Sequence, residues 1–262
     1  MPTLRRFLTA LALTLTSVML TVPVLAAGNL TIAAAADLKF AMEEIVTTFR
    51  KAHPDDQIDV IFGSSGKFNT QIQQGAPFDL YFSADIAFPR TLAEMGLSAG
   101  PVKPYAIGRI VLWSNVRDAS KMTLKDLTDP AIGKIAIASP RHAPYGKHAE
   151  EALRSVGIWD QLQDRLVQGE NIAQTAQFIQ TGNAGIGIIA LALALNPTLA
   201  KAGGYHLIDD RLHEPLEQGF IITRRAADNP LAQTFADFMG SPEARAIMIH
   251  YGFVLPGEQL EK

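Results

Sequence analysis

Two short segments of small and hydroxyl-bearing residues could do chemistry, and that chemistry is anion binding. The first is residues 33–39, which follow an apolar run at residues 30–33; the second is residues 62–67, which follow residues 58–62. Each apolar run predicts a strand, and the segment after it predicts the start of a helix. The first N–H groups of a helix lack partners within it and lie at the positive end of its dipole. The sequence therefore predicts two anion-binding turns in tandem.

The elements that must position these turns alternate between strands and helices. Apolar residues recur at helical spacing in residues 41–49, with charged residues on the other side. Further strands are predicted at residues 79–83, 107–114, 135–138, 186–189 and 219–223. The helix that follows the second turn is predicted to finish at residues 70–74, and further helices are predicted at residues 88–95, 148–156, 172–180, 230–239 and 242–250. This alternation predicts an α/β fold with mainly parallel sheets, whose ligands bind at the carboxyl ends of strands, where both turns lie.

The N-terminus predicts a cleaved secretory signal at residues 1–26. Arg5 and Arg6 precede a mostly apolar stretch, residues 7–20, and residues 24–26 (VLA) form a cleavage site. The chain has no cysteine, which excludes disulfides, thiol chemistry and a lipid anchor at the cleavage site. These features predict a protein of the bacterial periplasm that is not anchored to a membrane.

Composition and motifs exclude several other classes. The chain has 23 Lys and Arg against 26 Asp and Glu, and loss of the signal would make this balance more negative, which argues against nucleic acid as a partner. The six histidines show no metal-ligand spacing, so no metal is expected. Phosphate-loop, dinucleotide and nucleophile-elbow motifs are missing. The length suits one large or two modest domains.

At these turns the sequence resembles the family of periplasmic molybdate-binding proteins of ABC transporters. Besides the alanine run, the shared pattern includes residues 64–65 (SS) and 71–85 (QIQQGAPFDLYFSAD). It continues through residues 144–146 (PYG), 187–188 (GI) and 251–253 (YGF). The similarity covers the whole mature chain, and its most specific part is residues 75–85 (GAPFDLYFSAD).

The resemblance implies two Rossmann-like α/β lobes that are joined by two crossover segments and close on a tetrahedral dianion. The first lobe would comprise residues 27–106 and 225–262, and the second residues 107–224. Neutral hydrogen-bond donors would hold the anion in the cleft. The implied protein is a monomer without enzymatic activity or cofactor that captures molybdate, and also tungstate, for a membrane permease.

The resemblance also assigns ligand-binding positions to this chain. A side-chain ligand of the family falls on Asp37 and another on Ser65, while backbone N–H ligands fall on Tyr145 and Ile172. Further candidates around the site are Ser64, Lys39, Asn171 and Ala190.

Two of these positions depart from the family pattern. Ala190 lacks the hydroxyl of the family's tyrosine, which Tyr145 could supply from a different direction. A carboxylate at Asp37 would repel a dianion ~4 Å away by a few kcal/mol. The sequence therefore favours Asp37 as a helix cap, with its side chain on N–H groups two or three residues on and its own N–H toward the ligand. Lys39 or Lys67 could also neutralise it.

Three alternatives stay open from the sequence. The same fold could bind a different small anion or metabolite, because Asp37 and Ala190 depart from the pattern. An exported hydrolase could use Ser64 or Ser65, which requires a general base within hydrogen-bond reach. A sugar- or peptide-binding module would need stacking aromatics, and Phe, Trp and Tyr make up only 8% of the chain.

Overall fold

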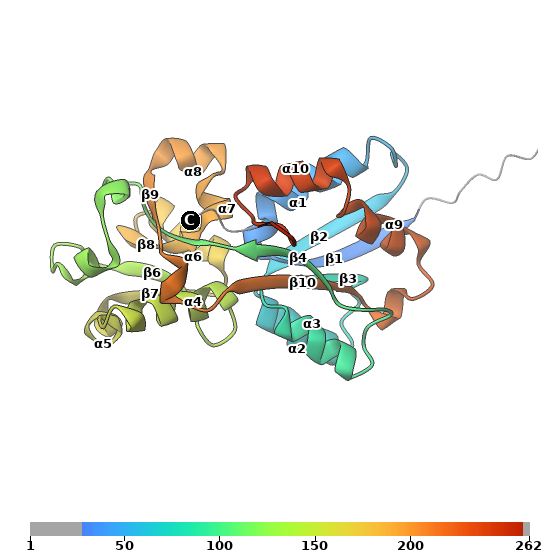
Figure 1. Cartoon of the computed structure of the whole chain (residues 1–262), viewed down its shortest axis with the longest axis horizontal. Coiled ribbons are helices and arrows are strands. Elements are labelled where there is room, and N and C mark those ends of the chain that lie inside the picture. The colour runs from blue at the N-terminus through green and yellow to red at the C-terminus, as the bar shows by residue number, and fades with distance from the viewer. Residues whose placement is uncertain (1–27, 259–262) are drawn as a thin grey trace, which may run out of the picture.

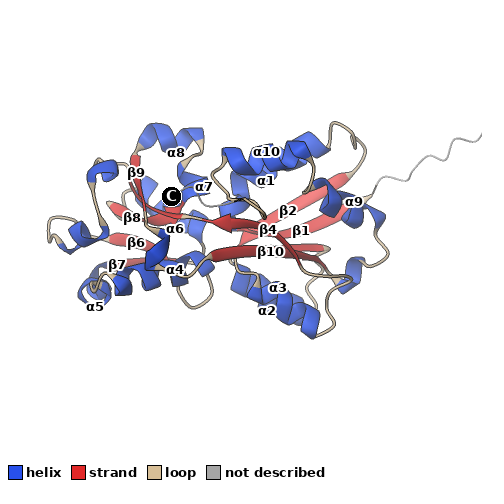
Figure 2. Ribbon diagram, viewed as in Figure 1, coloured by secondary structure: helices blue, strands red, loops and turns tan. Residues whose placement is uncertain are grey.

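The computed structural model describes residues 28–258, so the predicted signal peptide lies outside the described residues. Two five-stranded sheets lie side by side, and each is flanked by helices (Figures 1 and 2). We call the sheet that contains β1, with its helices, the first lobe, and the sheet that contains β6, with its helices, the second lobe. The predicted α/β class with two lobes is confirmed.

The first lobe begins and ends the described chain. In sheet order, its strands are β2 (Gln57–Gly63), β1 (Asn29–Ala35), β3 (Leu80–Ser83), β10 (Leu216–Ile222) and β4 (Lys103–Gly108). Its helices are α1 (Lys39–Phe49), α2 (Ser65–Gln73), α3 (Ala87–Glu94), α9 (Pro230–Phe238) and α10 (Pro242–His250). Figure 1 shows α1 and α10 on one side of this sheet and α2 and α3 on the other.

The second lobe is built from the middle of the chain. In sheet order, its strands are β7 (Leu166–Gly169), β6 (Ile135–Ala138), β8 (Ile186–Ala190), β5 (Ile110–Ser114) and β9 (Gly204–Leu207). Its helices are α4 (Pro144–Ser155), α5 (Trp159–Leu162), α6 (Ile172–Gln180), α7 (Leu191–Ala194) and α8 (Pro197–Ala202). Both α4 and α6 pack against β6, the central parallel strand.

Both sheets are mixed rather than mainly parallel. In the first lobe, β1 pairs in parallel with β2 and β3, whereas β10 pairs antiparallel with β3 and β4. In the second lobe, β6 pairs in parallel with β7 and β8, whereas β5 pairs antiparallel with β8 and β9. The antiparallel pairs arise because β5 and β10 enter their sheets from the other lobe rather than through a crossover helix.

Two segments carry the chain between the lobes, as predicted (Figure 1). The first is Arg109, which separates β4 from β5. The single strand predicted at residues 107–114 is therefore wrong, since its two halves pair in different sheets. The second segment is residues 208–215, which connect β9 to β10. The prediction placed residues 107–224 in the second lobe, but β10, within that range, pairs in the first sheet.

Each lobe has an apolar core that fixes its strand ends. In the first lobe, the apolar face predicted within residues 41–49 is buried, and Phe82 stacks on Phe220 with ring centroids 4.6 Å apart. Trp113 and its neighbours on β5 are buried in the second lobe. Within residues 28–258, no helix combines the length and the apolar character needed to cross a bilayer.

Candidate functional site

The starts of four helices converge on a small space between the lobes, which we call the inter-lobe cavity. The 3-10 helix η1 (Ala36–Leu38) and α2 come from the first lobe, and α4 and α6 come from the second. The cavity has a volume of about 10 Å³, room for about one water-sized sphere. Six predicted positions line it: Asp37, Ser64, Ser65, Tyr145, Asn171 and Ile172.

The fold explains why these helix starts meet. Each of the four helices follows a parallel strand, namely β1, β2, β6 and β7, so their starts lie at the carboxyl ends of the two sheets. Asn171 caps α6, because its side chain accepts a hydrogen bond of 3.0 Å from the N–H of Gln174. A Cβ at Gly146 would lie 2.2 Å from the carbonyl oxygen of Ala138, so only glycine lets α4 begin this close to β6.

Ser65 is held by the first lobe with its hydroxyl proton free. Its side chain is buried, and Oγ accepts a hydrogen bond of 3.0 Å from the N–H of Ala84. The Tyr81 hydroxyl donates to the Ser65 carbonyl at 2.7 Å and fixes the backbone. No described residue accepts a hydrogen bond from the Ser65 hydroxyl. This group is therefore available to an acceptor in the cavity.

Ser64 belongs to a contact between the lobes. Its hydroxyl donates to the carbonyl oxygen of His142 and lies 3.2 Å from Nδ1 of the same residue. The N–H of Gly66 also donates to the His142 carbonyl, at 3.0 Å. Burial lowers the pKa of His142, and the positive charges of Lys67 and Arg141 lower it further. The imidazole is therefore neutral at pH 7, and the two lobes meet here through neutral groups.

Asp37 lines the cavity with a buried carboxyl group that is 1% exposed. Its Oδ2 accepts hydrogen bonds from the Tyr145 hydroxyl at 2.9 Å and from Nε2 of Gln218 at 2.8 Å. The same Nε2 lies 3.1 Å from the Tyr145 hydroxyl, so the three side chains form a closed triangle. Burial raises the pKa of Asp37 from 3.8 to about 6, although the hydrogen bonds from Gln218 and Tyr145 lower it in part.

The prediction that Asp37 caps a helix is wrong. The N-cap of η1 is Ala35, and η1 has no side-chain cap. Asp37 lies inside this turn, where buried donors from β10 and α4 take its carboxylate instead. The suggested lysines do not neutralise it either. Lys67 pairs with Glu170 across the lobes at 3.0 Å, and Nζ of Lys39 lies 5.6 Å from the centre of the Phe40 ring.

Gln218 is a site residue that sequence reasoning missed. Its side chain is fully buried, and it lies at a register shift where β10 pairs with β4. A Cβ at Gly108 on β4 would lie 2.4 Å from the Tyr145 hydroxyl oxygen and 2.5 Å from Nε2 of Gln218. The strand predicted at residues 219–223 begins one residue after Gln218, whereas β10 starts earlier, at Leu216, so no signal in the sequence pointed to this residue.

The remaining predicted positions divide into two groups. Tyr145 and Ile172 occupy the second and first positions of α4 and α6, where backbone N–H groups have no partner within the helix. Ala190 ends β8, is fully buried and does not line the cavity. No hydroxyl group takes the place of the family's tyrosine hydroxyl at Ala190. The hydroxyl of Tyr145 reaches the cavity from α4, but it donates its hydrogen bond to Asp37.

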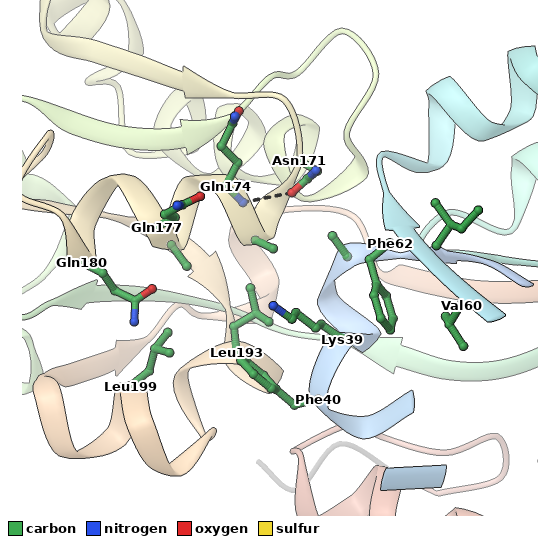
Figure 3. A pocket seen from close by; sticks show the side chains of 14 residues that line it. Lys39, Phe40, Val60, Phe62, Asn171, Gln174, Gln177, Gln180, Leu193 and Leu199 are labelled. Carbon is green, nitrogen blue, oxygen red and sulfur yellow. Dashed lines mark hydrogen bonds between the residues drawn. The ribbon is translucent and has the colours of Figure 1, made fainter. Parts of the chain in front are cut away.

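Lys39 lines a larger space, the outer cleft, with a volume of about 780 Å³ (Figure 3). Figure 3 shows Lys39 and Phe40 on one side and Gln174 and Gln177 of α6 on the other. The outer cleft shares Ala36 and Asn171 with the inter-lobe cavity, so the two spaces adjoin. Although it is larger, its mixed apolar and amide walls carry fewer of the predicted ligands than the inter-lobe cavity does.

The inter-lobe cavity has walls that offer an anion neutral hydrogen-bond donors and no cation. It gathers a free serine hydroxyl and helix-start N–H groups from both lobes, at the positive ends of four helix dipoles. Within residues 28–258, no group of three or more His, Cys, Asp or Glu could hold a metal ion. Two α/β lobes joined by two segments, with donors from both facing one cavity, define the class of hinged solute-binding proteins.

Comparisons with known proteins agree with this class. Residues 30–254 match the family model described as bacterial extracellular solute-binding protein. The chain belongs to this family. It is 35% identical over 257 residues to the molybdate-binding protein ModA of Rhodobacter capsulatus, covering 96% of this chain and 97% of that one. It is 34% identical to the ModA of Azotobacter vinelandii, covering 87% and 91%.

The solved structures give the same result. The periplasmic molybdate-binding protein of Azotobacter vinelandii superimposes with a TM-score of 0.80 at 31% identity. The match covers 87% of this chain and 99% of that structure, so both lobes and both connecting segments are included.

Proposed function

We propose that this protein captures molybdate in the periplasm and delivers it to the permease of an ABC transporter. The observation that carries the proposal is the convergence of neutral donors from both lobes on one buried cavity. The names of the relatives from Rhodobacter and Azotobacter, which match nearly the whole chain, support molybdate as the ligand. The donors are the Ser65 hydroxyl and the backbone N–H groups of Asp37, Tyr145 and Ile172.

Capture proceeds by closure of the lobes. A ligand that contacts both lobes stabilises the closed form by its contacts to each. Five contacts already join the lobes around the cavity. They are Asp37 with Tyr145, Gln218 with Tyr145, Ser64 with His142, Gly66 with His142, and Lys67 with Glu170. Opening of the lobes must break these contacts. They therefore help to set the equilibrium between the closed and open forms, which the ligand shifts toward the closed form.

Selection among oxyanions follows from size. Hydrogen-bond donors that are fixed at the positions of the four molybdate oxygens cannot all reach the smaller sulfate. Some donors would then stay unpaired, and an unpaired buried donor costs free energy. Tungstate is nearly the same size as molybdate and binds as well. Such a site needs no cofactor, and the protein acts as a monomer that is released after cleavage of residues 1–26.

The contact between Ser64 and His142 bears on the hydrolase alternative. A neutral imidazole 3.2 Å from a serine hydroxyl could serve as a general base. The Ser64 hydroxyl donates its proton to the His142 carbonyl instead, and both residues lie where the lobes touch. We propose that this pair closes the lobes and that the protein is not an enzyme; incubation with ester and phosphate substrates should yield no turnover.

Calorimetric and thermal titrations test the proposed function. The mature protein is titrated with molybdate, tungstate, sulfate, phosphate and chromate. A ligand at a hundredfold excess over its Kd should stabilise the protein by about 2.7 kcal/mol. We expect stabilisation by molybdate and tungstate and little by sulfate. Absence of stabilisation by any of the five anions would contradict the proposal and favour a different small metabolite.

A further inference from the structure

The carboxyl group of Asp37 lies at the cavity that is proposed to bind a negatively charged ligand. It lines the inter-lobe cavity together with Ser65, Tyr145 and Ile172, and it is almost completely buried. Charges interact strongly at such a site because little water screens them. The binding of an anion therefore requires that the carboxyl group either turn away or lose its charge.

The surrounding contacts prevent the carboxyl group from turning away. Its Oδ2 is held by the Tyr145 hydroxyl and by the Gln218 side chain, and both of these are buried. Gly108 lies against the other side of the same two groups, where even a Cβ would not fit. Asp37 thus keeps its place at the wall of the cavity.

No cation neutralises the carboxyl group from the elements packed against η1. Helix α1 carries Lys39, which lines the outer cleft, and Glu43 and Glu44, which are exposed. Helices α6 and α7 contain no titratable residue, and β2 contributes only Asp59, which is exposed. Tyr145 of α4 and Tyr105 of β4 face Asp37, and burial raises the pKa of both hydroxyls well above the usual range, so they stay neutral. Burial thus raises the pKa of Asp37 with no positive charge to oppose it.

The charged residues nearby in the sequence or on neighbouring elements have other surroundings. Lys39, two residues on, lines the outer cleft. Lys67 pairs with Glu170. Glu217, next to Gln218 on β10, is exposed and lies 3.9 Å from Arg90.

The two carboxyl oxygens differ in a way that suits a proton. Both side-chain donors use Oδ2, whereas Oδ1 has no hydrogen-bond partner among residues 28–258. The N–H groups of Asp37 and Leu38 lie near enough to lower the pKa of the carboxyl, but neither reaches hydrogen-bond geometry with Oδ1. A proton on Oδ1 would keep both existing hydrogen bonds and create a new O–H donor.

We propose that Asp37 binds the anion as a neutral carboxylic acid, so that capture of each dianion takes up one proton from solution. This inference rests on the proposed function. Ionised Asp37, one proton and molybdate combine to give a complex with a protonated carboxyl group, which donates a hydrogen bond to an oxygen of the anion. The proton returns to solution when the anion leaves. Asp37 is then a specificity-determining residue whose charge state controls affinity.

The proposal predicts a particular dependence of affinity on pH. Since anion and proton each favour the binding of the other, Kd must rise with pH wherever free Asp37 is ionised. If only the protonated form binds, Kd rises about tenfold per pH unit above about pH 6, the pKa of Asp37 in the free protein. Below that pH the dependence disappears.

Isothermal titration calorimetry of the mature protein tests the proposal. Molybdate is titrated between about pH 7 and 9 in pairs of buffers with different ionisation enthalpies, which gives the number of protons taken up. We expect nearly one proton per molybdate for the wild-type protein and none for Asp37→Asn, whose amide donates without titrating. Asp59→Asn, which changes an exposed carboxylate on β2, should behave as wild type.

The outcomes separate this inference from the proposed function. Molybdate binding by the wild-type protein without proton uptake, at a constant Kd, would overturn the role of Asp37 and leave the function intact. Proton uptake that persists in Asp37→Asn would overturn it as well. Tighter binding of phosphate than of molybdate, without proton uptake, would show instead that the ligand supplies the proton. Failure of the wild-type protein to bind molybdate at any pH would overturn both proposals.

Discussion

The Tyr145 hydroxyl donates a hydrogen bond of 2.9 Å to Oδ2 of Asp37 and so joins the start of α4 to the start of η1 across the two lobes. The two residues are 108 positions apart in the chain. The contact serves two purposes, because it closes the lobes and it orients the one carboxyl group on the cavity wall. Changes to either residue should therefore alter ligand affinity and the stability of the closed form together.

Tyr145→Phe removes this contact while keeping the ring and the backbone N–H. We expect molybdate affinity to fall about tenfold, because the closed form loses one buried hydrogen bond between the lobes. The free energy of unfolding should fall by about 1–2 kcal/mol, since Asp37 keeps only Gln218 as a side-chain donor. Calorimetry and urea denaturation measure the two effects.

Tyr205→Phe is the matched control for this variant. Tyr205 lies on β9 and is 36% exposed. It should bind molybdate as the wild-type protein does. Equal affinity of the two variants would contradict a role for the Tyr145 hydroxyl in closure.

The candidate site could be predicted from the sequence only as far as local structure determines it. Ser65 lies in a turn of small and hydroxyl residues after a short strand, and this signal lies within a few residues, whereas Ile172 was assigned by the family resemblance. The triangle of Asp37, Tyr145 and Gln218 could not be predicted, because Gln218 is 181 residues from Asp37 and reaches it through the order of strands in the first sheet. Local rules therefore favoured a cap for Asp37, although buried donors elsewhere take its carboxylate.

The stability of the ligand-free protein should depend on the charge of Asp37. The folded protein holds the proton up to about pH 6, whereas the unfolded chain releases it near pH 3.8. The stabilising effect of this proton is fully present below pH 3.8 and is lost as pH rises through 6, by about 3 kcal/mol in all. The free energy of unfolding of Asp37→Asn, relative to that of the wild-type protein, should therefore be higher at pH 8 than at pH 4. Urea denaturation at the two pH values measures this difference.

The same denaturation series on Asp59→Asn provides the reference for general effects of pH. Asp59 is exposed, so this variant should follow wild type throughout. A difference between wild type and Asp37→Asn that stays constant from pH 4 to 8 would show that Asp37 has the same pKa in the folded and unfolded chain.

The ion pair between Lys67 and Glu170 should contribute little, although it also joins the lobes. Its side chains are 45% and 49% exposed, so water and salt screen their 3.0 Å contact. Exposed pairs contribute about 0–1 kcal/mol. We expect Lys67→Met and Glu170→Gln each to weaken molybdate binding by less than about fivefold, and less at high salt. A loss as large as that of Tyr145→Phe would show that closure depends on charge.

The fold shows the same division between local and distant determinants. The amphipathic pattern of residues 41–49 predicted α1, and the apolar run of residues 58–62 predicted β2. Residues 107–114 form one apolar pattern, but the chain passes at Arg109 from one sheet to the other. Periodicity cannot show this, because the apolar run continues from the end of β4 into the buried β5 and only the partners of the two strands differ.

Gly108→Ala tests whether the triangle itself matters. The added Cβ would lie 2.4 Å from the Tyr145 hydroxyl oxygen and 2.5 Å from Nε2 of Gln218. These atoms are ends of side chains, which can shift, so the protein should still fold while the hydrogen bonds to Asp37 lengthen or break. We expect molybdate affinity to fall about tenfold or more, as for loss of one or two such bonds. Gly133→Ala, where the added Cβ has no atom within 4 Å, should bind as wild type. If Gly108→Ala also binds as wild type, the site tolerates displacement of Tyr145 and Gln218, and the Ser65 hydroxyl and the backbone N–H groups determine affinity.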